Sequence, residues 1–390
     1  MSVTAAQGFR AAGIAAGIKK SGRADLALVV NDGPRTEAAG VFTRNKVKAA
    51  PVLWSQQVLT TGALRAVVLN AGGANACTGP EGFQTAHATA EKAAEMLGCG
   101  AIEVAICSTG LIGEQLPRET VLAGVEKVSG ELAATPEAGA SVAGAIMTTD
   151  TVPKEAQVSD PAGWTVGGTT KGAGMIAPSM ATMLSVITTD AVVEQPVLDA
   201  ALREAVRYSF DRLDVDGSMS TNDTVLVLSS GASGVPADQA VFTAALTRVC
   251  RDLAAQMQAD AEGVSKRITV RVSGAASEDD AVTVARTIAR DALVKTAMFG
   301  SDPNWGRIAA AAGYADADID PETLDITING VLLCRGAVVA GDRADCDLSG
   351  KDVLIEVELG RSGGIEGNTA EIRTTDLSHA YVEENSAYSS

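Results

Sequence analysis

The sequence has 390 residues, a formal net charge of −17 at pH 7, 46% hydrophobic residues and only 3% aromatic residues. Because this length exceeds the size at which one hydrophobic core stops growing, we expect two lobes or domains. A core poor in aromatic residues must consist of Ala, Val, Leu and Ile, which suits a layered α/β protein. The acidic charge disfavours binding to nucleic-acid backbones and to anionic lipid surfaces.

The N-terminus and the cysteines indicate a cytoplasmic protein. The opening stretch, MSVTAAQGFRAAGIAAGIKK, lacks the basic region and the unbroken apolar run of a secretory signal. The cysteines are scattered without a CxxC pair, a pattern typical of reduced thiols rather than of a disulfide framework. They are Cys77, Cys99, Cys107, Cys250, Cys334 and Cys346.

Helical and strand-like patterns alternate along the chain, which predicts α/β layers. Helical periodicity covers residues 83–97, 117–132, 194–209, 236–258 and 278–292. Short β-rich runs cover residues 102–107, 183–189, 224–229, 267–273, 324–334 and 353–358. The uncharged stretch from Gly172 to Thr189 is long enough to raise the question of a membrane span. Its glycines, its proline and its hydroxyl residues favour a buried active-site segment instead.

Several classes of catalyst are excluded by the residues that the chain lacks. Two histidines, His87 and His379, are too few for a multi-histidine metal centre, and no HExxH motif or cysteine cluster replaces them. We interpret both histidines as surface or packing residues. Neither a GxxxxGK[ST] phosphate loop nor the GxSxG elbow of a serine hydrolase occurs.

A nucleophile in such a chain needs a base other than histidine, and an α-amino group is one solution. Its ordinary pKa is about 7.7–8.0, so it accepts a proton near neutral pH. A threonine hydroxyl on the same residue lies within its reach. Because the encoded terminus is Met1, such a threonine requires an internal cleavage.

The segment Lys171–Ala191, KGAGMIAPSMATMLSVITTDA, is where such a cleavage could occur. Gly172 permits close backbone approach, Pro178 ends any helix, and the residues after Thr182 predict a buried strand. The Thr182 hydroxyl could attack the carbonyl of Ala181, and hydrolysis after this N→O acyl shift would free the Thr182 amine. On the residues alone, a plain loop that leads into a core strand explains the segment as well, since Ala-Thr is an ordinary dipeptide.

The pattern KGAGMIAPxMATML resembles the signature of the ornithine acetyltransferases, also called bifunctional glutamate N-acetyltransferases of arginine biosynthesis. Further motifs of this family follow in order through most of the chain. They are FTRNKV at 42–47, NAGGANACTG at 70–79, CSTGLIGE at 107–114, MTTDT at 147–151, DGSMSTNDT at 216–224, DAEG at 260–263, FGSDPNWGR at 299–307 and the C-terminal YVEENSAYSS. One departure is Gly73, which replaces the second Asn of the usual NAGNANA and leaves a role for a side chain there in question.

The resemblance implies a fold and a maturation step. The fold is an αββα-type layered sandwich of an N-terminal-nucleophile enzyme, with threonine as the nucleophile. Cleavage between Ala181 and Thr182 would produce an alpha chain of residues 1–181 and a beta chain of residues 182–390. The two chains would stay intertwined and pair into a heterotetramer or a larger assembly.

The resemblance also assigns roles to individual residues. Thr182 is the nucleophile, with its own freed amine as general base, and Thr109 and Gly110 form the oxyanion hole. The positions expected to contact substrate are Thr148, Lys171, Thr182, Glu262, Asn385 and Ser390. Lys171 is a candidate cation for a substrate carboxylate, and Glu262 is a candidate partner for the side-chain ammonium of ornithine. Because chain ends usually fray, an active-site role for Asn385 and Ser390 requires an ordered C-terminus.

The implied reaction moves an acetyl group from N-acetylornithine to glutamate through an acetyl ester on Thr182, with ping-pong kinetics and without metal or nucleotide. Many family members also use acetyl-CoA as a co-substrate, and no residue decides whether this chain does. Three alternatives remain open. They are a hydrolase that passes the acyl group to water, a paralogue that uses the same acetyl chemistry in antibiotic biosynthesis, and a non-catalytic binding protein.

Overall fold

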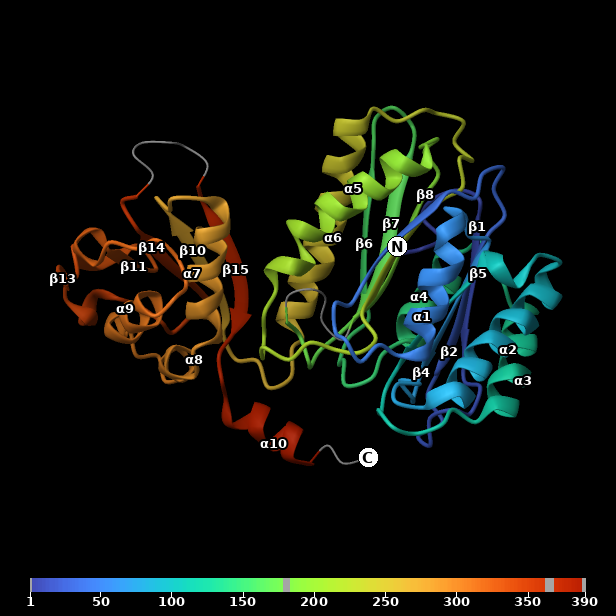
Figure 1. Cartoon of the computed structure of the whole chain (residues 1–390), viewed down its shortest axis with the longest axis horizontal. Helices are drawn as coiled ribbons and strands as arrows, with labels where there is room; N and C mark the ends of the chain where they lie inside the picture. The colour runs from blue at the N-terminus through green and yellow to red at the C-terminus, as the bar shows by residue number, and fades with distance from the viewer. Residues whose placement is uncertain (1, 178–182, 362–367, 388–390) are drawn as a thin grey trace. The chain divides into compact units, whose positions relative to one another are not determined.

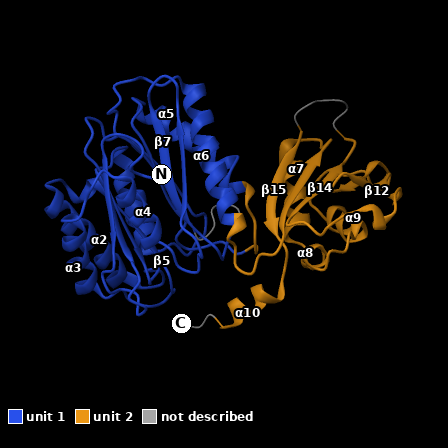
Figure 2. Ribbon diagram, turned by 180° about the vertical axis from the view of Figure 1, so that it is seen from behind, with its two compact units in different colours: residues 1–211, 218–257 blue, residues 212–217, 258–390 orange. Residues whose placement is uncertain are grey.

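The computed structural model describes residues 2–177, 183–361 and 368–387. It divides into two compact units, as Figures 1 and 2 show. Unit 1 comprises Met1–Asp211 and Ser218–Met257, and unit 2 comprises Arg212–Gly217 and Gln258–Ser390. The expectation of two lobes is confirmed.

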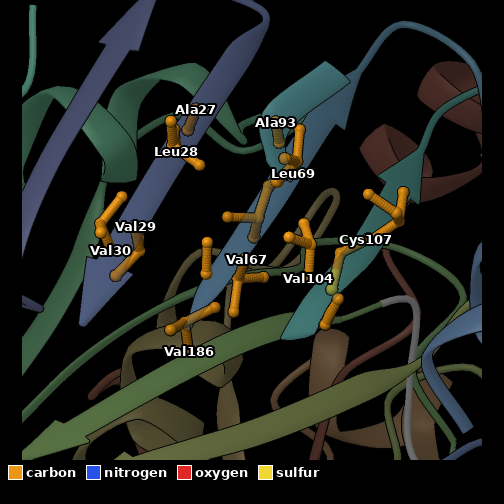
Figure 3. Close-up of a cluster of buried hydrophobic side chains, with 14 of the residues drawn as sticks. Ala27, Leu28, Val29, Val30, Val67, Leu69, Ala93, Val104, Cys107 and Val186 are labelled. Atoms are coloured by element: carbon orange, nitrogen blue, oxygen red, sulfur yellow. The ribbon is translucent and has the colours of Figure 1, made fainter. Parts of the chain in front are cut away.

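Unit 1 contains two sheets that share one hydrophobic core. The first has the strand order β1 (Phe9–Ile14), β2 (Leu26–Asn31), β4 (Ala66–Ala71) and β5 (Val104–Thr109). The second has the order β3 (Ala38–Phe42), β9 (Thr224–Ser229), β8 (Leu184–Thr189), β7 (Thr165–Lys171) and β6 (Lys154–Ser159). Val67 and Val104 of the first sheet and Val186 of the second lie in the same core cluster, which Figure 3 shows. The core consists mainly of Val, Ala, Leu and Ile, as the composition predicts.

Helices cover the outer faces of these two sheets. The four-stranded sheet is contacted by α2 (Gly79–Leu97) and α3 (Arg118–Ser129). The five-stranded sheet is contacted by α5 (Gln195–Arg207) and by α6 (Gln239–Ala259), which is hydrogen-bonded to β6 through Gln256 and Glu155. Two further helices, α1 (Ala50–Val58) and α4 (Pro136–Ala145), contact strands of both sheets. This arrangement confirms the αββα-type sandwich.

Unit 2 is a mixed sheet with its own core. Its strand order is β13 (Val338–Val339), β12 (Val331–Arg335), β11 (Asp325–Ile328), β14 (Asp352–Glu358), β10 (Arg267–Ser273) and β15 (Ala370–Thr375). The helix α7 (Glu278–Arg290) packs on β10 and β15, and α9 (Trp305–Gly313) packs on β11. Next to them lies α8 (Ala292–Phe299), and α10 (His379–Ala387) follows the last strand. Short 3₁₀ turns in the two units span Leu59–Thr61, Ala101–Glu103, Phe210–Arg212, Pro321–Thr323 and Arg343–Asp345.

The predicted elements agree with the structure in type, and β9 and β10 have the predicted bounds. The run 324–334, predicted as one strand, is the hairpin of β11 and β12. Asn329 and Gly330 have φ angles of +46° and +82° there, which is the backbone of a tight two-residue turn. The stretch 172–189 contains the buried strand β8. Among the described residues, no helix is both long enough and apolar enough to span a membrane.

The five-stranded sheet combines strands from both sides of the predicted cleavage point. β3, β6 and β7 precede Ala181, whereas β8 and β9 follow it. The strand order puts β9 and β8 between β3 and β7. If the chain is cut at this point, the two resulting polypeptides therefore share backbone hydrogen bonds along both β3–β9 and β7–β8. The boundary between the compact units lies elsewhere, since unit 1 contains residues on both sides of position 181.

Close packing of α4 on β1 depends on Gly13, and a substitution tests it. The Gly13 N–H donates to Ser141 Oγ at 2.8 Å, and a Cβ at position 13 would lie 2.2 Å from the Ser141 carbonyl oxygen. We expect Gly13→Ala to lower the free energy of unfolding by about 1–3 kcal/mol, because the helix must move. Gly144→Ala on the same helix meets nothing within 4 Å. This control should raise stability by about 0.5–1 kcal/mol. Equal denaturant midpoints for the two variants would contradict the close packing.

Candidate functional site

Two of the family motifs lie side by side in unit 1 because β4 and β5 run parallel and end together. The amides of Gly72 and Gly73 both donate to the Thr109 carbonyl oxygen at 3.0 Å. Gly110 has a φ of +130°, and a Cβ there would lie 2.5 Å from the Gly73 nitrogen. Position 110 therefore requires glycine for both its conformation and its packing. Gly73 contributes through its backbone, so its departure from the family pattern leaves the contact with Thr109 intact.

A third motif, DGSMSTNDT, is joined to these loops through Asn222. This side chain is buried, and its Nδ2 donates to the Ala74 carbonyl at 2.6 Å and to the Ser108 carbonyl at 2.9 Å. The sequence analysis quoted the motif but gave Asn222 no role. Three segments that are distant in sequence thus meet at one end of the strands of unit 1.

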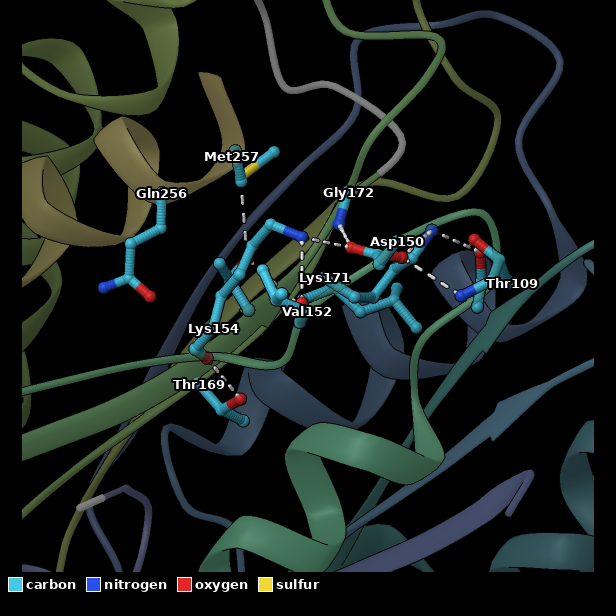
Figure 4. A network of polar contacts seen from close by, with 12 residues as sticks. Thr109, Asp150, Val152, Lys154, Thr169, Lys171, Gly172, Gln256 and Met257 are labelled. Atoms are coloured by element: carbon cyan, nitrogen blue, oxygen red, sulfur yellow. Dashed lines mark hydrogen bonds and ion pairs between the residues drawn. The ribbon is translucent and has the colours of Figure 1, made fainter. Parts of the chain in front are cut away.

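Lys171, the last residue of β7, reaches the same place, as Figure 4 shows. Its Nζ donates to Thr109 Oγ1 at 3.3 Å and lies 3.8 Å from Asp150 Oδ2. The Lys171 side chain is only 2% exposed, so it is not the solvated surface lysine that a single charged residue usually is. β7 pairs Lys171 with Leu184 of β8. The segment between these two residues carries the predicted cleavage site.

Asp150 organises the surroundings of Lys171. Its carboxylate accepts hydrogen bonds from Lys154 Nζ at 2.7 Å, from the Gly172 N–H at 2.7 Å and from the Thr148 N–H at 3.0 Å (Figure 4). Both Asp150 and Lys154 have side chains that are 0% exposed. The sequence analysis placed Thr148 and Lys171 in the site but missed the aspartate that holds both.

Asp150 is held as a carboxylate by its two lysine neighbours. Burial by itself raises the pKa of Asp150, but the charges of Lys171 and Lys154 and the hydrogen bonds to the carboxylate outweigh burial and hold this pKa well below its usual range. Two buried lysines thus share this carboxylate.

Lys19 supports the segment that leads to Thr148. Its Nζ donates to the carbonyls of Ala24 at 2.8 Å and of Met147 at 2.7 Å. Burial, with the charge of Arg23 as the next cause, lowers the pKa of Lys19 to about 8. The sequence analysis did not single out this lysine, because a basic residue in an N-terminal loop carries no pattern.

Unit 2 brings together two of the other predicted substrate residues. Asn385 in α10 donates its Nδ2 to Glu262 Oε2 at 3.0 Å. The start of α10 is fixed by the Ser378 hydroxyl, which accepts the Tyr381 N–H at 3.0 Å. The His379 ring packs against Phe299, with ring centroids 5.3 Å apart. Asn385 therefore lies within a helix and contacts Glu262, as a shared role of the two residues requires.

The predicted site residues that the structure describes thus form two groups, one in each unit. Thr109, Gly110, Thr148 and Lys171 gather in unit 1, and Glu262 and Asn385 pair in unit 2. The predicted nucleophile Thr182, its neighbour Ala181 and Ser390 lie outside the described residues.

The remaining side chains that the sequence analysis considered are His87 and the cysteines. His87 packs on Trp54, with ring centroids 4.8 Å apart, which confirms a packing role. The six cysteines are free thiols. In the part of the chain that the structure describes, no group of three or more His, Cys, Asp or Glu residues is arranged to hold a metal ion.

The sharing of one carboxylate by two buried lysines predicts a large effect for Asp150→Asn. The substitution removes the carboxylate that two buried lysines share, so we expect the free energy of unfolding to fall by about 3–5 kcal/mol at pH 7. Adding Lys154→Met to this variant should recover part of the loss, because one of the two buried positive charges is removed. Denaturant unfolding measures both.

The pH dependence of the free energy of unfolding is the control for this prediction. Because the pKa of Asp150 is lowered in the folded state, its contribution is present above the ordinary aspartate pKa and is lost as the pH falls through the folded value. Wild-type stability should therefore drop more steeply in acid than that of Asp150→Asn. Parallel profiles would contradict a charged Asp150.

Comparisons with known proteins identify the family of the chain. A model of the ArgJ family matches residues 10–390. The "Arginine biosynthesis bifunctional protein ArgJ" of Mycolicibacterium paratuberculosis is 63% identical over 393 residues, covering 100% of this chain and 96% of that protein. Its counterpart in Streptomyces coelicolor is 59% identical over 390 residues, covering 100% of both. A solved ornithine acetyltransferase from Mycobacterium tuberculosis, complexed with ornithine, is 63% identical, with a TM-score of 0.46, and covers 46% of this chain and 96% of that one. By the family model and these full-length relatives, the chain belongs to the ArgJ family.

Proposed function

We propose that the chain is a self-cleaving acetyltransferase of arginine biosynthesis. It transfers the acetyl group of N-acetylornithine to glutamate through an acetyl ester on Thr182. The observation that carries this proposal is the buried Lys171 ammonium on Thr109 Oγ1, next to Gly110 and at the strand end from which the segment bearing Thr182 departs. The names of the full-length relatives, which are bifunctional proteins of arginine biosynthesis, support the pathway.

Thr182 is the acyl carrier in this mechanism. Met183, the next residue, is held on both sides of its backbone, because its N–H donates to Asp223 Oδ1 at 3.1 Å and its carbonyl accepts the Thr224 N–H at 3.1 Å. Cleavage after Ala181 frees the Thr182 amine, which takes the hydroxyl proton as the oxygen attacks the acetyl carbonyl. The nitrogen of ornithine receives this proton when its bond to the acetyl carbon breaks.

Thr109 and Gly110 stabilise the negative charge that the attack builds on the carbonyl oxygen. Because Lys171 donates to Thr109 Oγ1, the Thr109 hydroxyl can donate its proton to another acceptor, which in this mechanism is the substrate carbonyl oxygen. The Gly110 N–H is the second donor, and a fixed donor of this kind typically contributes about 3–4 kcal/mol to transition-state stabilisation.

The same two groups of residues bind the substrates. Thr148 and Lys171 receive the substrate carboxylate, which the Lys171 ammonium group attracts. The Glu262 carboxylate accepts the side-chain ammonium of ornithine, and Asn385 orients the Glu262 side chain. We also assign Ser390 to substrate binding.

In the second half-reaction, the glutamate amine attacks the acetyl-Thr182 ester and leaves as N-acetylglutamate. Neither half-reaction needs a metal or a nucleotide, and acetyl-CoA is a candidate second acetyl donor. We assign the enzyme to the cytoplasm, in keeping with its scattered thiols. The cleaved chains form a heterotetramer, and the interleaved strands of unit 1 support an association that survives cleavage.

Maturation is tested by electrophoresis. Purified wild-type protein should show fragments of residues 1–181 and 182–390 under denaturing conditions, and these should elute as one species under native conditions because their strands interleave. Thr182→Ala should remain a single inactive chain. Ser185→Ala removes a hydroxyl from β8, which follows the cleavage point in the sequence, and should cleave normally. A wild-type protein that is active as one uncut chain would refute the mechanism.

The acyl acceptor is tested by kinetics. With N-acetylornithine as donor, release of ornithine should depend on glutamate, and double-reciprocal plots should be parallel, as for a covalent intermediate. Prompt acetate release that is independent of glutamate would identify a hydrolase instead. Complementation of an arginine auxotroph separates two readings. A gene for the biosynthetic enzyme should restore growth without arginine, whereas a gene for an antibiotic-pathway paralogue should not.

A further inference from the structure

Lys19 is a cation of unit 1 that the mechanism above does not use. The residue is half-buried, and its Nζ donates to the carbonyls of Ala24 at 2.8 Å and of Met147 at 2.7 Å. An ammonium group has three N–H donors, so one donor is left over. Within the described ranges of the chain, this group forms no third hydrogen bond and no ion pair with a carboxylate. An anion that reaches the remaining donor would form a charge-assisted hydrogen bond with it.

Two contacts place Lys19 beside the predicted substrate residues of unit 1. The Met147 carbonyl belongs to the peptide bond of Thr148, so Lys19 Nζ lies within about 5.3 Å of the Thr148 nitrogen by bond lengths. The apolar stem of Lys19 packs on the glycine loop, since a Cβ at Gly72 would lie 3.1 Å from Lys19 Cγ. The Gly72 N–H in turn donates to the Thr109 carbonyl oxygen at 3.0 Å. Lys19 therefore contacts both the segment that leads to Thr148 and the loop that binds Thr109.

The backbone of Lys19 is fixed by Asp25. This carboxylate is buried, and it accepts the Lys19 N–H at 2.8 Å and the Ala16 N–H at 2.7 Å. The Asp25 carbonyl oxygen accepts the N–H of Ala71, the last residue of β4, at 2.8 Å. The ammonium group is thus presented from a fixed backbone, which reduces the entropy that binding a ligand costs.

Lys19 also shares its electrostatic surroundings with Lys171. Burial is the main cause that lowers the pKa of Lys19 to about 8, and the charge of Arg23 is the next. The charge of Lys171 lowers this pKa further, whereas the charges of Asp25 and Asp150 raise it. A pKa of about 8 leaves the lysine mainly protonated at pH 7. An anion near both ammonium groups would be stabilised by both.

The two substrates of the proposed reaction differ in the charge of their side chains. N-acetylornithine has an ammonium group at the end of its side chain, which the proposed function assigns to Glu262. Glutamate has a carboxylate at that end, and the like charge of Glu262 would repel it. The α-carboxylate of each substrate can occupy the same place, at Thr148 and Lys171. The second carboxylate of glutamate therefore needs a cation that the acetyl donor does not use.

We propose that Lys19 binds the side-chain carboxylate of the acyl acceptor, glutamate, with its third N–H donor. The inference rests on the proposed function, because it needs glutamate as the second substrate. Lys19 is then a specificity residue of the second half-reaction, since it touches the acceptor and not the acetyl donor.

Lys19→Met tests this role, because it keeps most of the apolar stem and removes the charge. In a ping-pong reaction, kcat/KM for each substrate reports on the half-reaction of that substrate alone. We expect kcat/KM for glutamate to fall about tenfold to a hundredfold, the usual effect of losing a hydrogen bond to a charged group. The value for N-acetylornithine should stay within about threefold of wild type. Equal losses for the two substrates would show that Lys19 only supports the Met147 segment, and they would overturn the proposal.

Glutamine as acceptor gives a second measurement that a structural role would not change. Glutamine has the shape of glutamate without the side-chain charge, so the wild-type enzyme should prefer glutamate. In Lys19→Met the ratio of kcat/KM for glutamate to that for glutamine should fall by about tenfold or more. An unchanged ratio also overturns the proposal.

Lys20→Met is the matched control. Lys20 is the next residue of the chain and is exposed, so its substitution removes the same charge from the same loop. Both kcat/KM values should stay close to wild type. If Lys20→Met lowers the ratio as much as Lys19→Met does, the effect comes from the overall charge of the loop and the proposal is wrong.

The remaining outcomes also decide. If Lys19→Met does not fold, the same ratio is measured for Lys19→Gln, whose amide still donates a hydrogen bond but has no charge. The ratio should fall there as well, and a wild-type ratio overturns the proposal. Failure of the proposed function looks different, since the wild-type chain itself would then show no acetyl transfer from N-acetylornithine to glutamate.

Discussion

One buried carboxylate, Asp150, is the constraint on which the site in unit 1 depends. Two neighbouring lysines have almost no exposed surface, and an unpaired buried charge costs several kcal/mol. Asp150 is close to both, and it also accepts the backbone N–H groups of Gly172 and Thr148. The end of β7 and the segment before β6 therefore cannot move independently.

This constraint also holds the buried Lys171 ammonium group against Thr109, which belongs to the proposed oxyanion hole. An oxyanion is stabilised most by donors and charges that are already in place, because they need no reorganisation during the reaction. Lys171 meets this condition, since β7 fixes its backbone while Asp150 and Thr109 fix its ammonium group. The interleaving of β8 and β9 with β3 and β7 has a related consequence. A cut between β7 and β8 leaves the sheet, and with it the site, hydrogen-bonded.

Element prediction succeeded for several segments with a clear side-chain pattern, although the apolar runs of β2 and β4 were missed. RITVRVS in β10 alternates strictly, with buried residues at every second position, and TVLVLS in β9 is a continuous apolar run between polar segments. β7 was missed, because TVGGTTK has little apolar character. Its burial comes from tertiary contact, since a Cβ at Gly167 would lie 2.3 Å from the carbonyl oxygen of Ser2. The short helices α1, α8 and α9 were also missed, because each is too short for a convincing period.

The sequence by itself determined the family and the α/β layering, and it predicted a threonine with its own amine as base, because motifs and missing histidines are local facts. It also named Thr109, Thr148, Lys171, Glu262 and Asn385, which the structure places in two groups. Only the tertiary structure singled out Lys19, Asp150 and Asn222. In the sequence these are polar residues of ordinary loops, and burial and partners, such as the Ala74 carbonyl for Asn222, arise only when distant segments meet. A polar side chain acquires such a role from its desolvation, and desolvation is a property of the folded chain.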